Sequence, residues 1–357
     1  MKEIKSLTGL RGIAATTVMV GHIGLDVNKQ SLYYKLPFFP NYFKGSYLAV
    51  DLFFILSGFV LMLSYESSFK NITRKNIANY LFKRFARIYP LYFFCSIFYL
   101  LVYIWLGTNT IPTLGLILNF LLIQTPLGIV SIDIVGWSLS TEWICYFSFP
   151  LVAYVLFKNK LSNISYFSIY LILAILLWIV GNHERLSKFS LDYEHYWKGL
   201  WALFRTFLGF TLGNITYLLY RSKSFDKIYK WSWAILLYFV VLNGFVENVR
   251  WIILISFPLL LLSTTQEKGI LSRFFSWKPI YKLGLWSYSI YLIHMIIITE
   301  FRTWLYYSIK RTYFANFAFP FSLSFSLFLV IFLSRLCYKY LEIPIRKKLI
   351  HLYGHSN

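Results

Sequence analysis

The sequence predicts an all-α polytopic membrane protein with about ten transmembrane helices and one short re-entrant or buried helix at residues 111–124. Hydrophobic residues make up 58% of the 357 positions and charged residues only 14%, against roughly 25% in soluble globular domains. The apolar residues fall into stretches of about 16 to 24, near the roughly 20 residues that cross a bilayer as a helix. Lys and Arg, which give the chain a net charge of +21, gather in short clusters between these stretches.

Candidate spans follow one another along the whole chain. They comprise residues 7–24, 47–65, 86–106, 137–157, 164–181, 198–220, 231–246, 250–265, 284–300 and 317–338. The run 111–124 is shorter than these, and counting it as a span would place two basic connections on opposite sides of the membrane. For this reason we expect it to be re-entrant or buried.

The basic connections predict the topology, because short cytoplasmic loops of membrane proteins collect Lys and Arg. These connections are residues 66–87, 221–230 and 266–282, together with a basic tail at Arg346, Lys347 and Lys348. All four are expected in the cytoplasm. An even number of spans then places both termini there as well.

A single membrane domain over residues 1–350 and a short cytoplasmic tail, 351–357, are expected to make up the chain. The sequence shows no soluble domain and no internal repeat. The connections 25–46 and 182–197 fall on the outer side of the predicted topology and are candidates for an outer vestibule.

Several function classes lose support from the same observations. The basic residues lie between apolar runs and not on a soluble face, so they indicate topology, and no nucleic-acid partner is expected. Cys95, Cys145 and Cys337 are far apart, each inside an apolar run, and are interpreted as packing residues. No P-loop, dinucleotide fingerprint or zinc-type spacing occurs, so neither a metal site nor a tightly bound cofactor is expected.

The first candidate span contains two ionisable residues, Arg11 and His22. At about 100° per residue they fall within about 20° of the same helix face, about 16 Å apart along the axis. Ionisable groups inside a span are costly unless they are paired or face a wet cavity, which makes both residues functional candidates. The alternative is an Arg that extends to the interface and a His that only packs. The small residues Gly9, Gly12 and Gly21 around the same stripe favour function.

Two acidic residues are expected at the outer ends of spans. Asp51 begins the second span near the depth of His22, which allows a His–carboxylate pair that would fix the imidazole tautomer. The alternative is that Asp51 caps its helix near the N-terminus. Glu142 lies four positions after Ser138 on one face of the span 137–157, and a buried Glu there needs a partner.

A pair of arginines precedes the third span. Arg84 and Arg87 share a helix face at its cytoplasmic mouth, with Tyr89 just after them. Guanidinium groups bind phosphate bidentately, so docking of an anionic ligand is one interpretation. Anchoring of the span on the cytoplasmic side is the other, and the spacing alone does not separate the two.

A second histidine lies in the span 284–300. Ser287, Tyr291 and His294 follow the i, i+4, i+7 stripe of one helix face and are candidates for lining the same cavity. For a single intramembrane His with aromatic neighbours, an interhelical hydrogen bond explains the residue as well as catalysis does. His294 therefore ranks below His22.

Taken together and in chain order, six motifs resemble the acyltransferase 3 family of bacterial membrane O-acyltransferases. They are Leu10-Arg11 with His22; Val50-Asp51-Leu52-Phe53-Phe54 with Ser57-Gly58-Phe59; Arg84 with Arg87-Ile88-Tyr89-Pro90; Trp137-Ser138-Leu139-Ser140 with Glu142; Ser287-Tyr288-Ser289-Ile290-Tyr291-Leu292-Ile293-His294; and Tyr338 with Glu342, Pro344 and Arg346. The resemblance covers nearly the whole chain and is closest to the stand-alone type, without a fused soluble domain. Ala49 and Met295 depart from the family pattern, which bears more on acceptor fit than on chemistry.

The resemblance implies transfer of an acyl group, usually acetyl from acetyl-CoA on the cytoplasmic side, to an envelope glycan or lipid-linked sugar. The acceptor is a sugar hydroxyl of lipopolysaccharide, capsule or exopolysaccharide, and the enzyme lies in the bacterial cytoplasmic membrane. By the same resemblance His22 is the catalytic residue and general base, and Arg11 is its motif partner. Arg84 and Arg87, with Tyr89, contact acyl-CoA.

The remaining motif residues have less defined roles. Asp51 and Glu142 are further catalytic candidates. Positions on the acceptor side, or with a structural role, are Ser57, Trp137, Ser138, Ser287, Tyr291 and His294.

Alternatives remain open on both mechanism and class. Direct transfer, with Asp51 or Glu142 orienting His22, and a covalent route through an acylated protein residue are equally compatible with the sequence. A non-enzymatic glycan or lipid transporter is the strongest rival, although the repeated halves that are common in transporters are not found. A glycan polymerase is the third interpretation, and it would more naturally carry a larger outer loop than 182–197.

Overall fold

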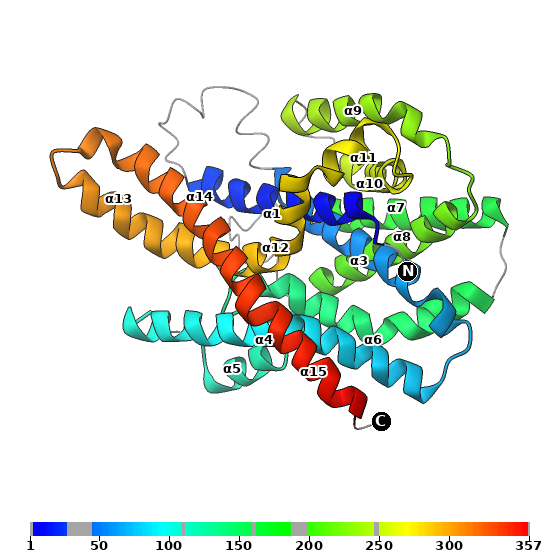
Figure 1. Cartoon of the computed structure of the whole chain (residues 1–357), viewed down its shortest axis with the longest axis horizontal. Helices are drawn as coiled ribbons and strands as arrows, with labels where there is room; N and C mark the ends of the chain where they lie inside the picture. The colour runs from blue at the N-terminus through cyan, green and yellow to red at the C-terminus, as the bar shows by residue number, and fades with distance from the viewer. Residues whose placement is uncertain are drawn as a thin grey trace.

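The computed structural model describes residues 3–26, 45–108, 111–158, 162–186, 199–245 and 250–355. All regular structure within these ranges is helical (Figure 1). The prediction of an all-α fold is therefore confirmed. Most of the connections 25–46 and 182–197, expected to form an outer vestibule, lies outside the described residues.

The helices follow the apolar runs of the sequence. Their bounds are α1 Lys5–Asp26, α3 Leu48–Phe69, α4 Arg74–Trp105, α5 Thr113–Phe120, α6 Gly136–Lys158, α7 Asn163–Leu186, α8 Gly199–Arg221, α9 Ser232–Phe245, α10 Arg250–Thr265, α11 Gly269–Ser276, α12 Lys278–Ile296, α13 Arg302–Lys310, α14 Ala318–Cys337 and α15 Ile343–His355. A π-helical turn, Ile297–Phe301, joins α12 to α13, and a second, Tyr338–Glu342, joins α14 to α15. α13 and α14 lie side by side as a hairpin that projects from the other helices (Figure 1).

Five helical segments in the described residues are long and apolar enough to cross a bilayer. They are Leu48–Phe69, Arg74–Trp105, Gly136–Lys158, Lys278–Lys310 and Ala315–Tyr353. Shorter apolar helices are found at Ile164–Leu176, Ile228–Val241 and Ile252–Thr265. The chain is thus a multi-pass membrane protein, and the count of about ten spans stays a prediction.

The run 111–124 forms only a short helix. α5 has 8 residues, too few to cross a bilayer. Asn119 ties the following loop back onto it, because its Nδ2 donates to the Val130 carbonyl at 2.9 Å and its Oδ1 accepts from the Ile132 N–H at 2.9 Å. Leu114 is 65% exposed, so α5 is not a buried helix. The folded-back loop fits the re-entrant alternative.

Glycines allow close contact between α1 and α12. A Cβ on Gly12 would lie 2.4 Å from the backbone nitrogen of Gly284, and one on Gly284 would lie 1.9 Å from the Thr8 carbonyl oxygen. Small residues are what allow two membrane helices to approach this closely. The two helices run parallel, since His22 contacts His294 ten residues farther along both. The face of α1 that carries Arg11 and His22 is thereby held against α12.

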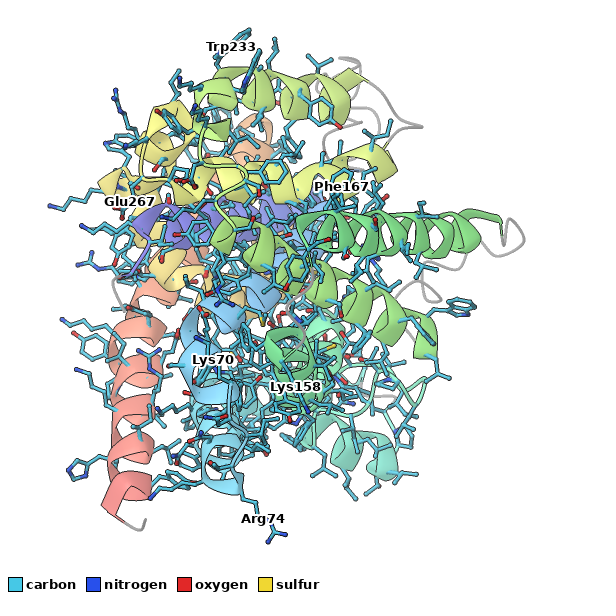
Figure 2. The ribbon with its side chains drawn as sticks, turned by 90° about the vertical axis from the view of Figure 1, so that its right-hand side faces the viewer. Lys70, Arg74, Lys158, Phe167, Trp233 and Glu267 are labelled. Atoms are coloured by element: carbon cyan, nitrogen blue, oxygen red, sulfur yellow. The ribbon has the colours of Figure 1, made fainter. Side chains whose placement is uncertain are left out.

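Contacts between connections gather the basic segments at one end of the bundle. Arg221 Nε lies 3.1 Å from Glu66 Oε1, and Gln266 Nε2 lies 3.4 Å from Asp226 Oδ1. Near the beginning of α1, Glu3 Oε2 accepts from the Tyr281 hydroxyl at 3.0 Å. The rings of Phe82 and Tyr353 stack at 4.1 Å between centroids, which brings α15 to the same end. Lys70, Arg74 and Glu267, labelled in Figure 2, belong to these connections.

Candidate active site

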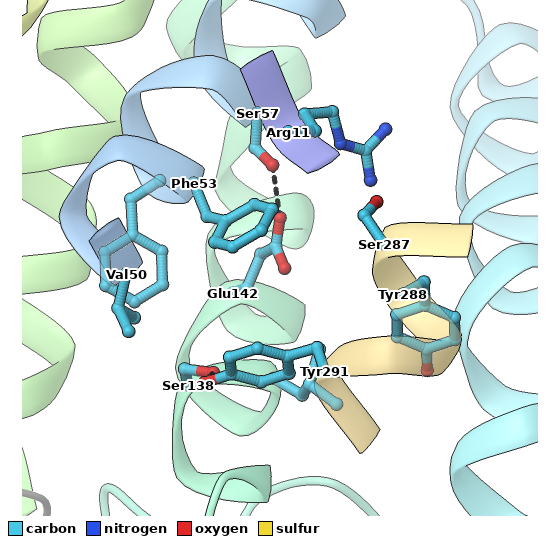
Figure 3. A pocket seen from close by; sticks show the side chains of 11 residues that line it. Arg11, Val50, Phe53, Ser57, Ser138, Glu142, Ser287, Tyr288 and Tyr291 are labelled. Atoms are coloured by element: carbon cyan, nitrogen blue, oxygen red, sulfur yellow. Dashed lines mark hydrogen bonds between the residues drawn. The ribbon is translucent and has the colours of Figure 1, made fainter. Parts of the chain in front are cut away.

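A polar pocket opens between four helices that are far apart in sequence (Figure 3). Its lining consists of Arg11 from α1; Val50, Phe53, Phe54 and Ser57 from α3; Ser138, Leu139 and Glu142 from α6; and Ser287, Tyr288 and Tyr291 from α12. Its cavity volume is about 50 Å³. The structure therefore brings residues of four predicted motifs into one cavity.

Glu142 is the acidic centre of this pocket. The Ser57 hydroxyl donates to Glu142 Oε1 at 2.5 Å (Figure 3), and the Tyr146 hydroxyl donates to the same oxygen at 2.7 Å. Tyr146 is one helical turn beyond Glu142 on α6, so its contact follows from helix periodicity. The partner that the sequence required for a buried Glu142 is found, and it is not a histidine.

Ser138 and Tyr291 close the pocket on the side toward the second histidine. Their hydroxyl oxygens lie 2.8 Å apart, and the Tyr291 hydroxyl also lies 3.3 Å from the Val135 carbonyl oxygen. The Tyr291 ring is 5.9 Å from the ring of His294. This contact connects the pocket to the interior of the α1–α12 interface.

Arg11 extends its guanidinium into the pocket on the side of Ser287 (Figure 3). The charges that act on Arg11 include Arg87 of α4, Glu142 of α6 and Glu342 of the π-helical turn. Glu342 is in turn acted on by Arg346. Residues from five segments thus form one partly buried charge cluster at the basic end of the bundle, with arginines in excess over glutamates.

Arg84 lies beside this cluster. Its Nη2 donates to the Tyr65 hydroxyl at 3.4 Å, and its guanidinium carbon sits 5.7 Å from the centre of the Tyr65 ring. Its Nε and the Tyr80 hydroxyl are buried and have no hydrogen-bond partner within the described chain. An unpaired buried donor is costly, so a ligand that accepts hydrogen bonds would be favoured here.

Tyr89 and Trp137 are not part of the pocket lining. Tyr89 stacks on Phe85, with ring centroids 4.7 Å apart, in an aromatic row on α4. Trp137 is 4% exposed and packs edge-on against Phe54 at 6.1 Å. Both side chains support the helices around the site.

The two predicted histidines form a pair. His22 Nδ1 lies 3.0 Å from His294 Nε2, and the two rings are inclined by only 20°. His294 is fully buried, and its Nδ1 lies 3.0 Å from the Ile290 carbonyl oxygen one turn earlier on α12. The relation between His22 and His294 was not expected from the sequence, which ranked His294 lower.

Asp51 does not pair with His22, so that expectation is wrong. Both carboxylate oxygens of Asp51 are bound by Arg205 of α8, from Nε at 2.7 Å and from Nη2 at 2.6 Å. The two side chains are 2% and 6% exposed. A bidentate guanidinium offers a carboxylate two charge-assisted hydrogen bonds, which an imidazole cannot match. Arg205 was not among the predicted site residues. An Arg inside the apolar run 198–220 indicates a paired or functional residue and could have drawn attention to it.

Within the described part of the chain, no cluster of three or more His, Cys, Asp or Glu side chains is arranged to hold a metal ion. The polar groups of the site are hydroxyls, two carboxylates, guanidiniums and a pair of imidazoles. Such a set can bind anions and move a proton.

Comparison with known proteins gives matches along most of the chain. A family model described as an acyltransferase domain matches residues 4–338. Acyltransferase MdmB of Streptomyces mycarofaciens is 25% identical over 323 residues, covering 83% of this chain and 79% of that protein. O-acetyltransferase OatA of Staphylococcus aureus is 23% identical over 385 residues, covering 97% of this chain and 58% of that protein. No solved structure matches.

Proposed function

Because the chain belongs to the acyltransferase family whose model matches residues 4–338, we propose that this membrane enzyme transfers acetyl from acetyl-CoA to a sugar hydroxyl. The acceptor in this proposal is a cell-envelope or extracellular polysaccharide, such as O-antigen, capsule or exopolysaccharide. The name of the relative OatA, an O-acetyltransferase, supports acetyl as the group and oxygen as its acceptor atom.

The observation that carries the proposal is the placement of two polar groups of residues along the α1–α12 interface. At one end Arg11 extends into the pocket that contains Glu142, and about three turns farther along α1 His22 meets His294. Transfer from a negatively charged thioester needs anion-binding groups, which lie at one end of this interface. The attacking hydroxyl needs a base, which lies at the other end.

The donor is proposed to bind at the basic end. Coenzyme A has several phosphates, and a guanidinium binds phosphate bidentately. Arg84 and Arg87 are the first candidates. Arg84 Nε is buried and has no partner among the described residues, and Arg87 belongs to the charge cluster around Arg11. The excess of arginines over glutamates in that cluster favours an anion.

In the proposed reaction His22 is the general base. Its imidazole takes the proton from the sugar hydroxyl as the oxygen attacks the thioester carbon, the carbon–sulfur bond breaks, and the proton passes to the departing thiolate. The products are the sugar ester and free coenzyme A. General-base catalysis of this kind contributes roughly 10²–10⁴-fold to the rate.

Neither Asp51 nor Glu142 is proposed to orient His22, since Arg205 binds one carboxylate and Ser57 with Tyr146 bind the other. Glu142 instead offsets the charge of Arg11, which lines the same pocket. This keeps the guanidinium ordered before the donor binds.

The proposed orientation places the basic end in the cytoplasm, where acyl-CoA is made, with both termini there and the enzyme in the cytoplasmic membrane. The positive-inside rule and the clustering of the basic connections at one end support it. A reporter enzyme fused after Gly128, in the loop that follows α5, should then be active outside the cell.

The function is tested with membranes that contain the enzyme, envelope glycan and acetyl-CoA labelled in the acetyl group. Label should move to the glycan as an alkali-labile ester, with one free coenzyme A released per acetyl transferred. Glycan that crosses the membrane without thioester cleavage would indicate a transporter and overturn the proposal.

A further inference from the structure

The two histidines determine each other's protonation, and this leads to a role for His294. We propose that His294 is a positioning residue that holds His22 as the tautomer with its proton on Nδ1 and a free lone pair on Nε2. The inference rests on the proposed function, because it names the atom of His22 that acts as the base.

The backbone carbonyl of Ile290 sets the direction of the hydrogen bonds in this pair. The Ile290 carbonyl oxygen only accepts hydrogen bonds, so His294 Nδ1, 3.0 Å away, must supply the proton of that contact. A neutral imidazole has one N–H, so His294 Nε2 then has a lone pair and accepts. The atom 3.0 Å from it, His22 Nδ1, must be the donor. In a neutral His22 this leaves Nε2 without a proton.

This chain of hydrogen bonds has the form that general bases use in other enzymes, with a neutral partner in place of the usual carboxylate. In a serine hydrolase triad a buried Asp accepts from one imidazole nitrogen and leaves the other free to take a proton. Here the Ile290 carbonyl accepts from His294 Nδ1, and His294 Nε2 in turn accepts from His22 Nδ1, which leaves His22 Nε2 free to take a proton. Asp51 and Glu142, the acidic motif residues nearest in the predicted topology, are bound elsewhere.

A neutral partner also limits the pair to one proton. When His22 accepts the hydroxyl proton on Nε2, the new imidazolium still donates from Nδ1 to the lone pair of His294. A second proton on His294 would place two positive rings 5.2 Å apart in a buried site, which is strongly unfavourable. The pair therefore takes up one proton and gives it to the leaving thiolate before the next turnover.

The backbone keeps the pair in place. Gly12 and Gly284 fix the distance between the helices, and His22 and His294 lie on the same interface ten residues farther along both. Tyr291, whose ring is 5.9 Å from His294, is held by Ser138 across the pocket. The His294 ring is thus confined on three sides, as a positioning group requires.

Two substitutions at position 294 separate positioning from packing. In His294→Gln the side-chain amide reaches the place of Nε2, where its carbonyl oxygen can accept from His22 Nδ1. In His294→Asn the shorter amide reaches only the place of Nδ1, so it can donate to Ile290 and leaves His22 without an acceptor. Loss of an orienting partner typically costs roughly 10–100-fold in activity.

With acetyl-CoA and glycan as substrates, His294→Asn should lose kcat by roughly 10–100-fold at unchanged KM for acetyl-CoA, and His294→Gln should recover most of it. Equal kcat in the two variants would overturn the positioning role. His22→Ala is measured alongside, because full activity there would overturn the proposed base itself, a separate failure.

A spectroscopic measurement on the wild-type protein tests the tautomer directly and does not depend on whether a variant folds. The chain has 6 histidines, so wild-type protein labelled with ¹⁵N-histidine and studied in lipid by solid-state NMR gives few signals. His22 should show a protonated Nδ1 and an unprotonated Nε2, with a hydrogen bond to His294. The opposite tautomer of His22 would contradict the proposal.

Discussion

Gly12 of α1 and Gly284 of α12 meet backbone to backbone, so closely that a Cβ on Gly12 would lie 2.4 Å from the Gly284 nitrogen. Glycine is needed at both positions because any side chain would push the helices apart. The same interface holds Arg11 in the pocket and His22 against His294. The spacing of the two helices is therefore a condition for the site.

Gly12→Ala tests this condition. Overpacking of a tight contact costs about 1–3 kcal/mol and shifts the backbone, so we expect a lower Tm in detergent and an acetyl transfer rate at least about 10-fold lower. Gly136→Ala is the matched control, because a Cβ there meets its nearest atom at 3.4 Å, ordinary contact. Wild-type transfer in Gly12→Ala would show that the site does not depend on the spacing.

Asp51 and Arg205 are expected to stabilise the fold and not to take part in the chemistry. Removing one partner leaves a buried unpaired charge at a cost of about 3–5 kcal/mol, so Asp51→Leu and Arg205→Met should each lower Tm strongly. The double variant Asp51→Leu/Arg205→Met replaces the pair by apolar packing and should recover both Tm and activity. A double variant that folds but does not transfer acetyl would return Asp51 to the catalytic residues.

The sequence could predict which site residues share one face of a helix, because this follows from the helical repeat of 3.6 residues. Arg11 and His22 do lie on one face of α1, and Ser287, Tyr291 and His294 do share the face of α12 that meets it. Which residue pairs with which could not be predicted. Helix register across the bundle depends on the packing of glycines, which spacing within one helix does not reveal.

Binding of acetyl-CoA is tested at two arginines in the N-terminal half of α4. Arg84→Gln and Arg87→Gln each remove a charged hydrogen-bond donor worth about 1.5–3 kcal/mol, so KM for acetyl-CoA should rise roughly 10-fold or more. Lys83→Gln removes the same charge from an exposed neighbour and should leave KM unchanged. Similar effects in all three variants would indicate a general field of positive charge instead of a phosphate site.

Asp133, in the loop before α6, makes stability depend on pH. Burial raises the pKa of its carboxyl well above the ordinary value, and one of its oxygens has no partner within the described residues. A folded pKa above the unfolded one contributes stability at low pH that is lost as pH rises through the folded pKa. The Tm of Asp133→Asn relative to wild type should therefore increase from about pH 5 to about pH 9.

The control for this titration is Asp226→Asn, which changes an exposed carboxylate in the connection 221–230. Its Tm relative to wild type should show little change over the same range. A difference for Asp133→Asn that does not vary with pH would mean that the carboxyl titrates alike in the folded and unfolded chain.

Asp51 and Arg205 also show where reasoning from the sequence reached its limit. An Asp and a His at equal depth on neighbouring helices made a plausible pair, yet a guanidinium on α8 binds both carboxylate oxygens. Arg205 lies within an apolar run, 154 positions from Asp51, and contact at that separation exists only once the helices have packed. The pairing of His22 with His294, 272 positions apart, was hidden for the same reason.

Acetyl transfer by His22→Ala tests whether His22 is the general base. Membranes with wild type, His22→Ala or His351→Ala receive acetyl-labelled acetyl-CoA and envelope glycan, and label in the glycan is followed over time. The exposed His351 of α15 serves as the matched control and should transfer at the wild-type rate. We expect His22→Ala to lose at least about 100-fold of the transfer rate. Equal transfer by His22→Ala and wild type would show that His22 is not the general base.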